Sequence, residues 1–342
     1  LREQLNKHLN ISEIQTYFPD LALFFELYND SKTSFTLNSK FLVNSLKENI
    51  ESKKTDSYIK NFFKAEILDQ SSNEVFEKDL FIKILPLLNI SQSMMNDYNL
   101  NNTHGLPNIF SCQASKKINN YNNSAYIDSF FSYLASKLVE NGKCPCFPIF
   151  YGTYTAVAEQ FMYNITEDFN SIKKTTWYDE FVDDKFKIIT VETEKIINEN
   201  LLNTEIDIDT EIEDLSSVFD INDIKFIDVE TEPKNIDFNN YDTLSIDSSS
   251  SSQLDGDLKY CAINNFPVQL NCIEKLKGTL DDYIEETNNN ISEQEWKSII
   301  FQICFGLSVA QKQFNFCHND LHSSNIMFRE TNLKYLYYRF KG

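Results

Sequence analysis

The chain has 342 residues, with 51 acidic and 31 basic side chains and a formal net charge of -20. This length allows one large two-lobed domain or two ordinary ones, and a hydrophobic content of 42% is enough for a packed core. The excess of acidic residues argues against binding to the phosphates of a nucleic acid. No apolar run is long enough to span a bilayer.

The first 60 residues are expected to form a helical N-terminal extension. Ser12 and Gln15 have the spacing of a capping box, and apolar residues from Phe18 to Tyr28 recur at helical spacing behind them. A second helix is expected from Asn38 through Ile50. Stripes of this kind are typical of packing surfaces rather than of ligand sites.

Residues 62–68 and 79–85 are apolar runs that predict strands. The second run contains Lys83. A lysine within a strand is costly to bury without a partner, so its side chain is expected either to face solvent or to meet an anion.

Residues 124–140 have the strongest helical pattern of the first half, ending before Gly142, which is a plausible cap. Asp128 lies near the start of this helix. Cys144 and Cys146 have the spacing of half a metal site, but no second Cys or His pair completes it, so we interpret them as buried thiols.

The pattern changes from about residue 166 to residue 257, where acidic and serine runs predict an insertion that is largely disordered. Order returns near Phe266, where Val268, Leu270 and Cys272 alternate with two polar residues, Gln269 and Asn271, and predict a half-buried strand. Two capping boxes follow, at Thr279 with Asp282 and at Ser292 with Glu295, and the second opens a long helix.

The string His318-Asn319-Asp320-Leu321-His322-Ser323-Ser324-Asn325-Ile326 places polar residues at fixed offsets between two apolar runs. Asp320 can accept a proton from a hydroxyl, and Asn325 offers an amide oxygen to a hard cation such as Mg²⁺. His318 can brace the loop through its ring nitrogens. A carboxylate beside a metal ligand is what phosphoryl transfer requires, whereas the alternative is a chance loop with a buried histidine and a solvated aspartate.

The same string matches the catalytic-loop signature H-x-D-L-x-x-x-N of protein kinases. The chain therefore resembles the eukaryotic-type protein kinase superfamily, and its D-L-H variant most resembles serine/threonine kinases of giant DNA viruses. The resemblance implies an α+β, two-lobed fold, with a small lobe over residues 61–165 and the hinge and start of a truncated large lobe over residues 258–342. Residues 166–257 are then an insertion between small-lobe strands.

The resemblance also implies that ATP and Mg²⁺ bind and that a protein Ser or Thr hydroxyl is phosphorylated. Lys83 matches the lysine of the V-A-I-K strand, which binds the α- and β-phosphates, and Asp128 is its expected acidic partner. In this resemblance Asp320 is expected to position the acceptor hydroxyl, and Asn325 is expected to bind the Mg²⁺ ion. The hinge residues expected to bond the adenine through their backbone are Ile273, Glu274, Lys275 and Leu276.

The chain departs from the kinase pattern at several positions. No glycine precedes Gly105, so a different turn, Asp69–Asn73, is expected to cover the phosphates. Asn319 replaces the usual arginine, and His322 replaces the usual lysine, as is common in small-molecule kinases of related fold. A second strand is expected over residues 333–340, and no Asp-Phe-Gly motif follows.

We therefore expect a fragment that ends before that motif and is inactive on its own. Three functions stay open: a serine/threonine protein kinase, a small-molecule phosphotransferase, and a pseudokinase that acts as a binding module. Seven cysteines without a disulfide-framework spacing indicate a reducing compartment, so we expect a cytoplasmic location, or a virion if the protein is viral. The sequence carries no signal for an oligomeric state.

Overall fold

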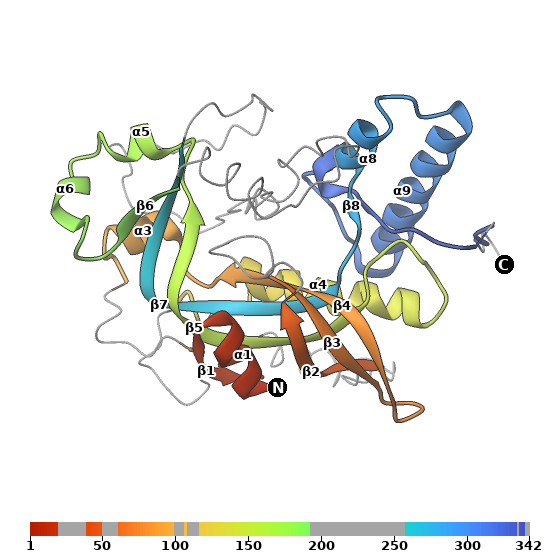
Figure 1. Cartoon of the computed structure of the whole chain (residues 1–342), viewed down its shortest axis with the longest axis horizontal. Helices are drawn as coiled ribbons and strands as arrows, with labels where there is room; N and C mark the ends of the chain where they lie inside the picture. Colours follow the sequence, from red (N-terminus) through yellow and green to blue (C-terminus); the bar gives the residue numbers. More distant parts are fainter. Residues whose placement is uncertain are drawn as a thin grey trace, which may run out of the picture.

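The computed structural model describes residues 1–19, 39–49, 61–98, 106–107, 116–191, 257–333 and 335–338. A long curved sheet forms the centre of the molecule, with one group of short helices at one end and a helical group that includes the C-terminal residues at the other (Figure 1). The N-terminal helix α1 (Arg2–Leu9) contacts β1 (Ile11–Gln15) and β2 (Phe41–Asn49), the first and last strands of the sheet order (Figure 1).

Seven antiparallel strands of the described residues form the sheet, in the order β1-β5-β7-β4-β3-β2, with β6 paired to β7. The sheet curls, because β2 contacts β5 although three strands lie between them in this order. The described residues therefore form a mixed α/β fold with a curled antiparallel sheet, which agrees with the expected mixture of helices and strands. The two-lobed kinase arrangement stays a prediction. The strands are β1 (Ile11–Gln15), β2 (Phe41–Asn49), β3 (Phe62–Asp69), β4 (Glu74–Pro86), β5 (Phe150–Asn164), β6 (Lys187–Val191) and β7 (Leu258–Glu274).

The core follows the two-residue period of the sheet's strands. On β3, Phe63, Ala65 and Ile67 are fully buried, whereas the residues between them are partly exposed. On β4, Leu80 and Ile82 continue the same cluster. Each such apolar side chain contributes roughly 1.5–3 kcal/mol relative to leaving it in water. The strands predicted over residues 62–68 and 79–85 are confirmed, the second as part of the longer β4.

Helix α4 (Ser124–Glu140) spans the residues that were predicted and contacts β5 and β7. Its N-cap is Asn123, whose side chain accepts a hydrogen bond from the Ala125 N–H at 3.1 Å. At its other end the Gly142 N–H donates to the Val139 carbonyl, and Gly142 has a φ of 62°. This left-handed conformation suits glycine, so the predicted C-terminal cap is confirmed.

The helical group at the C-terminal side begins directly after β7. The two predicted capping boxes are both present, at the start of α8 and of α9. Since these signals depend only on residues three apart, they fix the helix starts locally. The elements are β8 (Gly278–Thr279), α8 (Leu280–Glu286), α9 (Glu293–Phe314), the 3₁₀ turn η4 (Ser323–Asn325) and β9 (Met327–Phe328), which pairs with β8.

The predicted insertion is ordered over its first part, which corrects the expectation of disorder from residue 166. Residues 166–191 form α5 (Phe169–Ile172), α6 (Tyr178–Phe181) and β6, and Figure 1 shows them at the same end of the sheet as α3 (Ile90–Met94). Aromatic residues explain this order, because Trp177 and Tyr178 both contact Phe186 edge to face. The remaining part of the predicted insertion, residues 192–256, lies outside the described residues.

The helical extension predicted for residues 1–60 is wrong where the structure describes it, apart from α1. Ser12 and Gln15 lie on β1, and the predicted helix from Asn38 contains β2. Register shifts in the pairing of β2 with β3 place two buried residues, Val43 and Leu46, three positions apart. This interval imitates the spacing of a helix. Residues 20–38 lie outside the described residues.

The second strand predicted over residues 333–340 is also not formed where the structure describes it, at residues 333 and 335–338. Its aromatic residues do not alternate between a buried and an exposed face, and Tyr337 is 89% exposed. In the part of the chain that is described, no helix combines the length and apolar character needed to cross a bilayer.

Candidate active site

The first group of predicted site residues meets between α4 and the sheet. The Lys83 ammonium on β4 lies 2.9 Å from Oδ2 of Asp128 on α4, so the expected ion pair is present. The two side chains are 23% and 32% exposed, so both are only partly desolvated. Lys83 is therefore neither buried alone nor turned to bulk solvent, and its charge is held at one edge of the helix.

The predicted hinge lies one strand away from Lys83. Ile273 and Glu274 are the last residues of β7, and Lys275 and Leu276 lie in the connection to β8. The Glu274 N–H donates to the Ile149 carbonyl at 2.8 Å, and the Lys275 N–H donates to the Asp79 carbonyl. None of the described residues accepts a hydrogen bond from the Leu276 N–H. This donor is the hinge group that a ligand could use.

The second group is the loop between α9 and β9. The Asn325 amide nitrogen donates to the Asp320 backbone carbonyl and to its Oδ2, both at 3.0 Å. It also lies 2.8 Å from Nε2 of His322, which must accept, because the other partners of this nitrogen fix it as the donor. The Asn325 amide oxygen is thereby turned away from Asp320. These hydrogen bonds hold the Asp320 carboxylate and the Asn325 amide next to each other in the loop.

The predicted bracing role of the His318 ring is not borne out at Nδ1. This atom is buried, and the described residues offer it no hydrogen-bond partner. The His318 backbone carbonyl instead accepts a hydrogen bond from the Asp320 N–H at 2.8 Å. Asn319 between them has a φ of 60°, a left-handed conformation that asparagine tolerates better than most residues. Backbone geometry therefore shapes this turn.

Two contacts that the sequence did not indicate tie the loop to the remaining elements. The Ser324 hydroxyl donates to Asp281 on α8 at 2.6 Å. Phe131, three residues after Asp128 on α4, stacks on Phe316 with ring centroids 4.1 Å apart. The same helix therefore contacts both groups of site residues. Aromatic character at positions 131 and 316 was visible in the sequence, but nothing in their spacing indicated that they meet.

The two groups are joined by short connections, although no hydrogen bond or ion pair among the described residues links them directly. Lys83 lies opposite Asn271 in the pairing of β4 with β7. β7 leads through residues 275–277 to β8, which pairs with β9 directly after Asn325. The structure thus brings Lys83 to Asp128 and brings Asp320 to Asn325, on either side of the predicted hinge.

The turn Asp69–Asn73, which was predicted to cover phosphates, lies in the wrong place for that role. It joins β3 to β4, and Asn73 is ten residues before Lys83 on an extended strand, or roughly 33 Å at 3.3 Å per residue. The Asp69 carboxylate accepts hydrogen bonds from the Ser71 N–H and hydroxyl, so it serves the hairpin itself.

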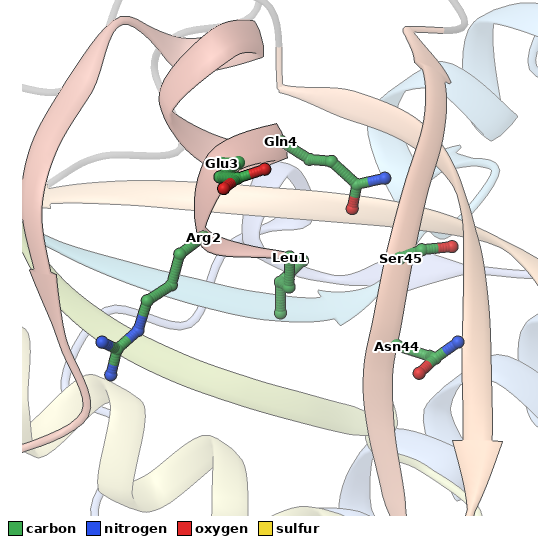
Figure 2. Close-up of a pocket in the computed structure, with 6 residues that line it drawn as sticks. All are labelled: Leu1, Arg2, Glu3, Gln4, Asn44 and Ser45. Carbon is green, nitrogen blue, oxygen red and sulfur yellow. The ribbon is translucent and has the colours of Figure 1, made fainter.

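A hollow between α1 and β2 is lined by residues other than those of the predicted site. Figure 2 shows the Gln4 side chain directed towards β2, where its oxygen accepts a hydrogen bond from the Leu46 N–H at 3.0 Å. None of the predicted site residues lines this hollow. Its lining residues are Leu1, Arg2, Glu3, Gln4, Asn44 and Ser45.

Few groups of the described residues suit a metal ion. No cluster of three or more His, Cys, Asp or Glu side chains is found among them. At the loop, the Asn325 amide oxygen and the Asp320 carboxylate supply the hard oxygen donors that Mg²⁺ prefers. Cys144 is buried, and a hydrogen bond from the Cys146 thiol lowers the pKa of Cys144 to about 7. Within the described part of the chain, these two thiols are partners of each other and join no larger group of metal-ligating side chains.

Comparison with known proteins gives one partial match. A segment of 66 residues, 19% of this chain, is 36% identical to a probable serine/threonine-protein kinase of Dictyostelium discoideum. The match covers 5% of that relative, so the whole relative's activity does not transfer to this chain. The expected likeness to kinases of giant DNA viruses receives no support from it. No protein-family model matches the chain, and no solved structure matches it. The comparisons therefore support a relation to the kinase superfamily and nothing finer.

Proposed function

We propose that this chain binds ATP with Mg²⁺ and supplies the nucleotide-binding region and catalytic loop of a serine/threonine protein kinase. The observation that carries the proposal is the ion pair of Lys83 with Asp128, because these residues are 45 positions apart and meet at 2.9 Å. The curled antiparallel sheet is compatible with a kinase small lobe. The partial match to a probable kinase supports the same superfamily.

The nucleotide is proposed to lie between the two groups of site residues. Lys83 would bind the α- and β-phosphates, with Asp128 holding its ammonium group in place. The Leu276 N–H, which is free among the described residues, would donate to the adenine. Lys275 is unsuited to that contact, because its N–H is already bonded to Asp79.

The catalytic loop is proposed to position the acceptor hydroxyl. As the hydroxyl oxygen forms its bond to the γ-phosphorus, the bond from that phosphorus to the β–γ bridging oxygen breaks and ADP leaves. The proton of the hydroxyl passes to the Asp320 carboxylate. Asn325 holds Oδ2 of this carboxylate at 3.0 Å, which leaves Oδ1 to meet the hydroxyl. The chain thus contributes orientation and a proton acceptor.

Mg²⁺ would be held by the Asn325 amide oxygen, and when bound it would neutralise part of the phosphate charge. The orientation of the Asn325 side chain supports this assignment, since its nitrogen is engaged by Asp320 and His322.

The proposal is tested by titrating the chain with MgATP in a calorimeter. Lys83→Met should weaken binding by about 10- to 100-fold, since a hydrogen bond to a charged group is worth about 1.5–3 kcal/mol. Lys78→Met is the matched control, because Lys78 lies on the same strand and is exposed. Absence of binding to the wild-type chain, or binding that Lys83→Met leaves unchanged, overturns the proposal.

Acceptor tests on the full-length protein separate the three functions that the sequence left open, because this chain alone is expected to be inactive. Transfer to Ser and Thr peptides that Asp320→Asn abolishes, with MgATP binding retained, supports the protein kinase. Transfer to low-molecular-weight hydroxyl compounds alone supports a small-molecule phosphotransferase, which His322 in place of lysine favours. MgATP binding with no transfer to either class of acceptor supports a binding module.

A further inference from the structure

The interface between α4 and the sheet is polar where most helix–sheet contacts are apolar. Gln269 and Asn271 on β7 are both 0% exposed, although the strand pattern predicted that they face solvent. Helix α4 covers their face, so the expected half-buried strand is wrong. The polar residues of this interface are Asp128, Ser129 and Ser132 on α4, Thr153 on β5, and Gln269 and Asn271 on β7.

Asn271 is the strand residue of this interface that contacts Asp128, which belongs to the proposed nucleotide site. It is the direct cross-strand partner of Lys83, and antiparallel partners project to the same face of a sheet. Its amide nitrogen donates to Oδ1 of Asp128 at 3.1 Å and to the Ser132 hydroxyl at 2.9 Å. Lys83 occupies Oδ2 of the same carboxylate at 2.9 Å. Each carboxylate oxygen therefore has its own donor from the sheet.

This second donor fixes the carboxylate in one orientation. With Lys83 alone, the Asp128 carboxylate could rotate about its own bond, because it is 32% exposed and water can take the place of either oxygen's partner. With Asn271 on the other oxygen, the plane of the carboxylate is set by two neighbouring strands. Asn271 is itself held by Ser132, one helical turn beyond Asp128.

We propose that Asn271 is a positioning residue for the nucleotide site, which it orders by holding Asp128 and, through Asp128, the Lys83 ammonium. This inference rests on the proposed function, because it names a determinant of the same site. Asn271 does not touch the nucleotide. Its effect on phosphate binding passes entirely through the ion pair.

The chain offers a matched control two residues away. Gln269 is equally buried, lies on the same face of β7, and donates to the Thr153 hydroxyl at 2.6 Å rather than to Asp128. Asn271→Leu and Gln269→Leu should therefore lower the melting temperature of the ligand-free chain alike. Only Asn271→Leu should weaken MgATP binding, by about 5- to 10-fold, which is a loss that a merely structural role would not produce.

A double variant shows whether the effect passes through Lys83. In a Lys83→Met background, Asn271→Leu should cause no further loss of MgATP affinity, because the group that it positions is gone. Asn271→Ser, which is too short to reach Asp128, should reproduce the loss if the leucine variant does not fold. Equal affinities of Asn271→Leu and wild type, or additive losses with Lys83→Met, overturn the inference. Failure of Lys83→Met to weaken binding overturns the proposed function instead.

Discussion

Loss of the Asn123 side chain at the start of α4 should destabilise the helix that carries Asp128. Asn123 is 3% exposed, and its side-chain oxygen caps the helix at the Ala125 N–H. Its amide nitrogen donates to the carbonyls of Leu87 at 2.8 Å and Lys117 at 3.2 Å. Asn123→Ala removes all three hydrogen bonds at once.

The magnitude follows from these contacts. Loss of an N-cap costs about 1 kcal/mol. The Leu87 carbonyl, next to a fully buried side chain, would lose its partner away from water, which costs a further 1–3 kcal/mol or so. We therefore expect the free energy of unfolding to fall by about 2–4 kcal/mol, with the cap and the carbonyl together accounting for the loss.

Urea unfolding followed by circular dichroism measures this change as a lower midpoint with an unchanged slope. Asn122→Ala is the control, because Asn122 is exposed and should shift the free energy of unfolding by less than about 0.5 kcal/mol. A loss below about 1 kcal/mol for Asn123→Ala would refute the reasoning, since it would mean that water reaches the Leu87 carbonyl in the folded chain.

Three further predictions concern other parts of the fold. Gly278→Ala should lower the urea midpoint by an amount equivalent to about 1–2 kcal/mol, because the added Cβ would lie 2.8 Å from the Asp282 carboxylate that completes the α8 capping box; an unchanged midpoint would contradict this. Burial raises the pKa of Cys272 from 9.0 to about 12, so iodoacetamide at pH 8.5 should label the exposed Cys304 and Cys317 and spare Cys272. Because the Cys272 thiol loses its proton more readily in the unfolded chain than in the folded one, its contribution to the free energy of unfolding is complete below pH 9 and is lost as the pH rises towards 12. The urea midpoint should therefore fall over that range.

The parts of the fold that sequence patterns predicted correctly are those that depend on near neighbours. The helix at residues 124–140 was found from the helical spacing of its apolar residues and from Gly142 after its end. The boxes opening α8 and α9 were found because a cap and its partner are only three positions apart. The pairing of Lys83 with Asp128 was expected only through the kinase resemblance, since no local signal connects a strand to a helix 45 residues later.

The errors arose where tertiary context decides the outcome. Bulges in β2 gave Val43 and Leu46 the spacing of a helix face. Asn271 was expected to face water, because alternation along a strand does not reveal whether a helix covers the polar face. The Asp69–Asn73 turn was assigned by elimination, and only the strand order shows that it lies at the far end of its hairpin.

The antiparallel pairing of β6 with β7 has a consequence for how this chain can vary. Val191 and Leu258 are cross-strand partners, so the polypeptide leaves the sheet and re-enters it at neighbouring points. Whatever length of sequence joins these points, both strands keep their hydrogen bonds. The β6–β7 ladder therefore anchors the two ends of the intervening chain side by side on the same sheet that carries Lys83.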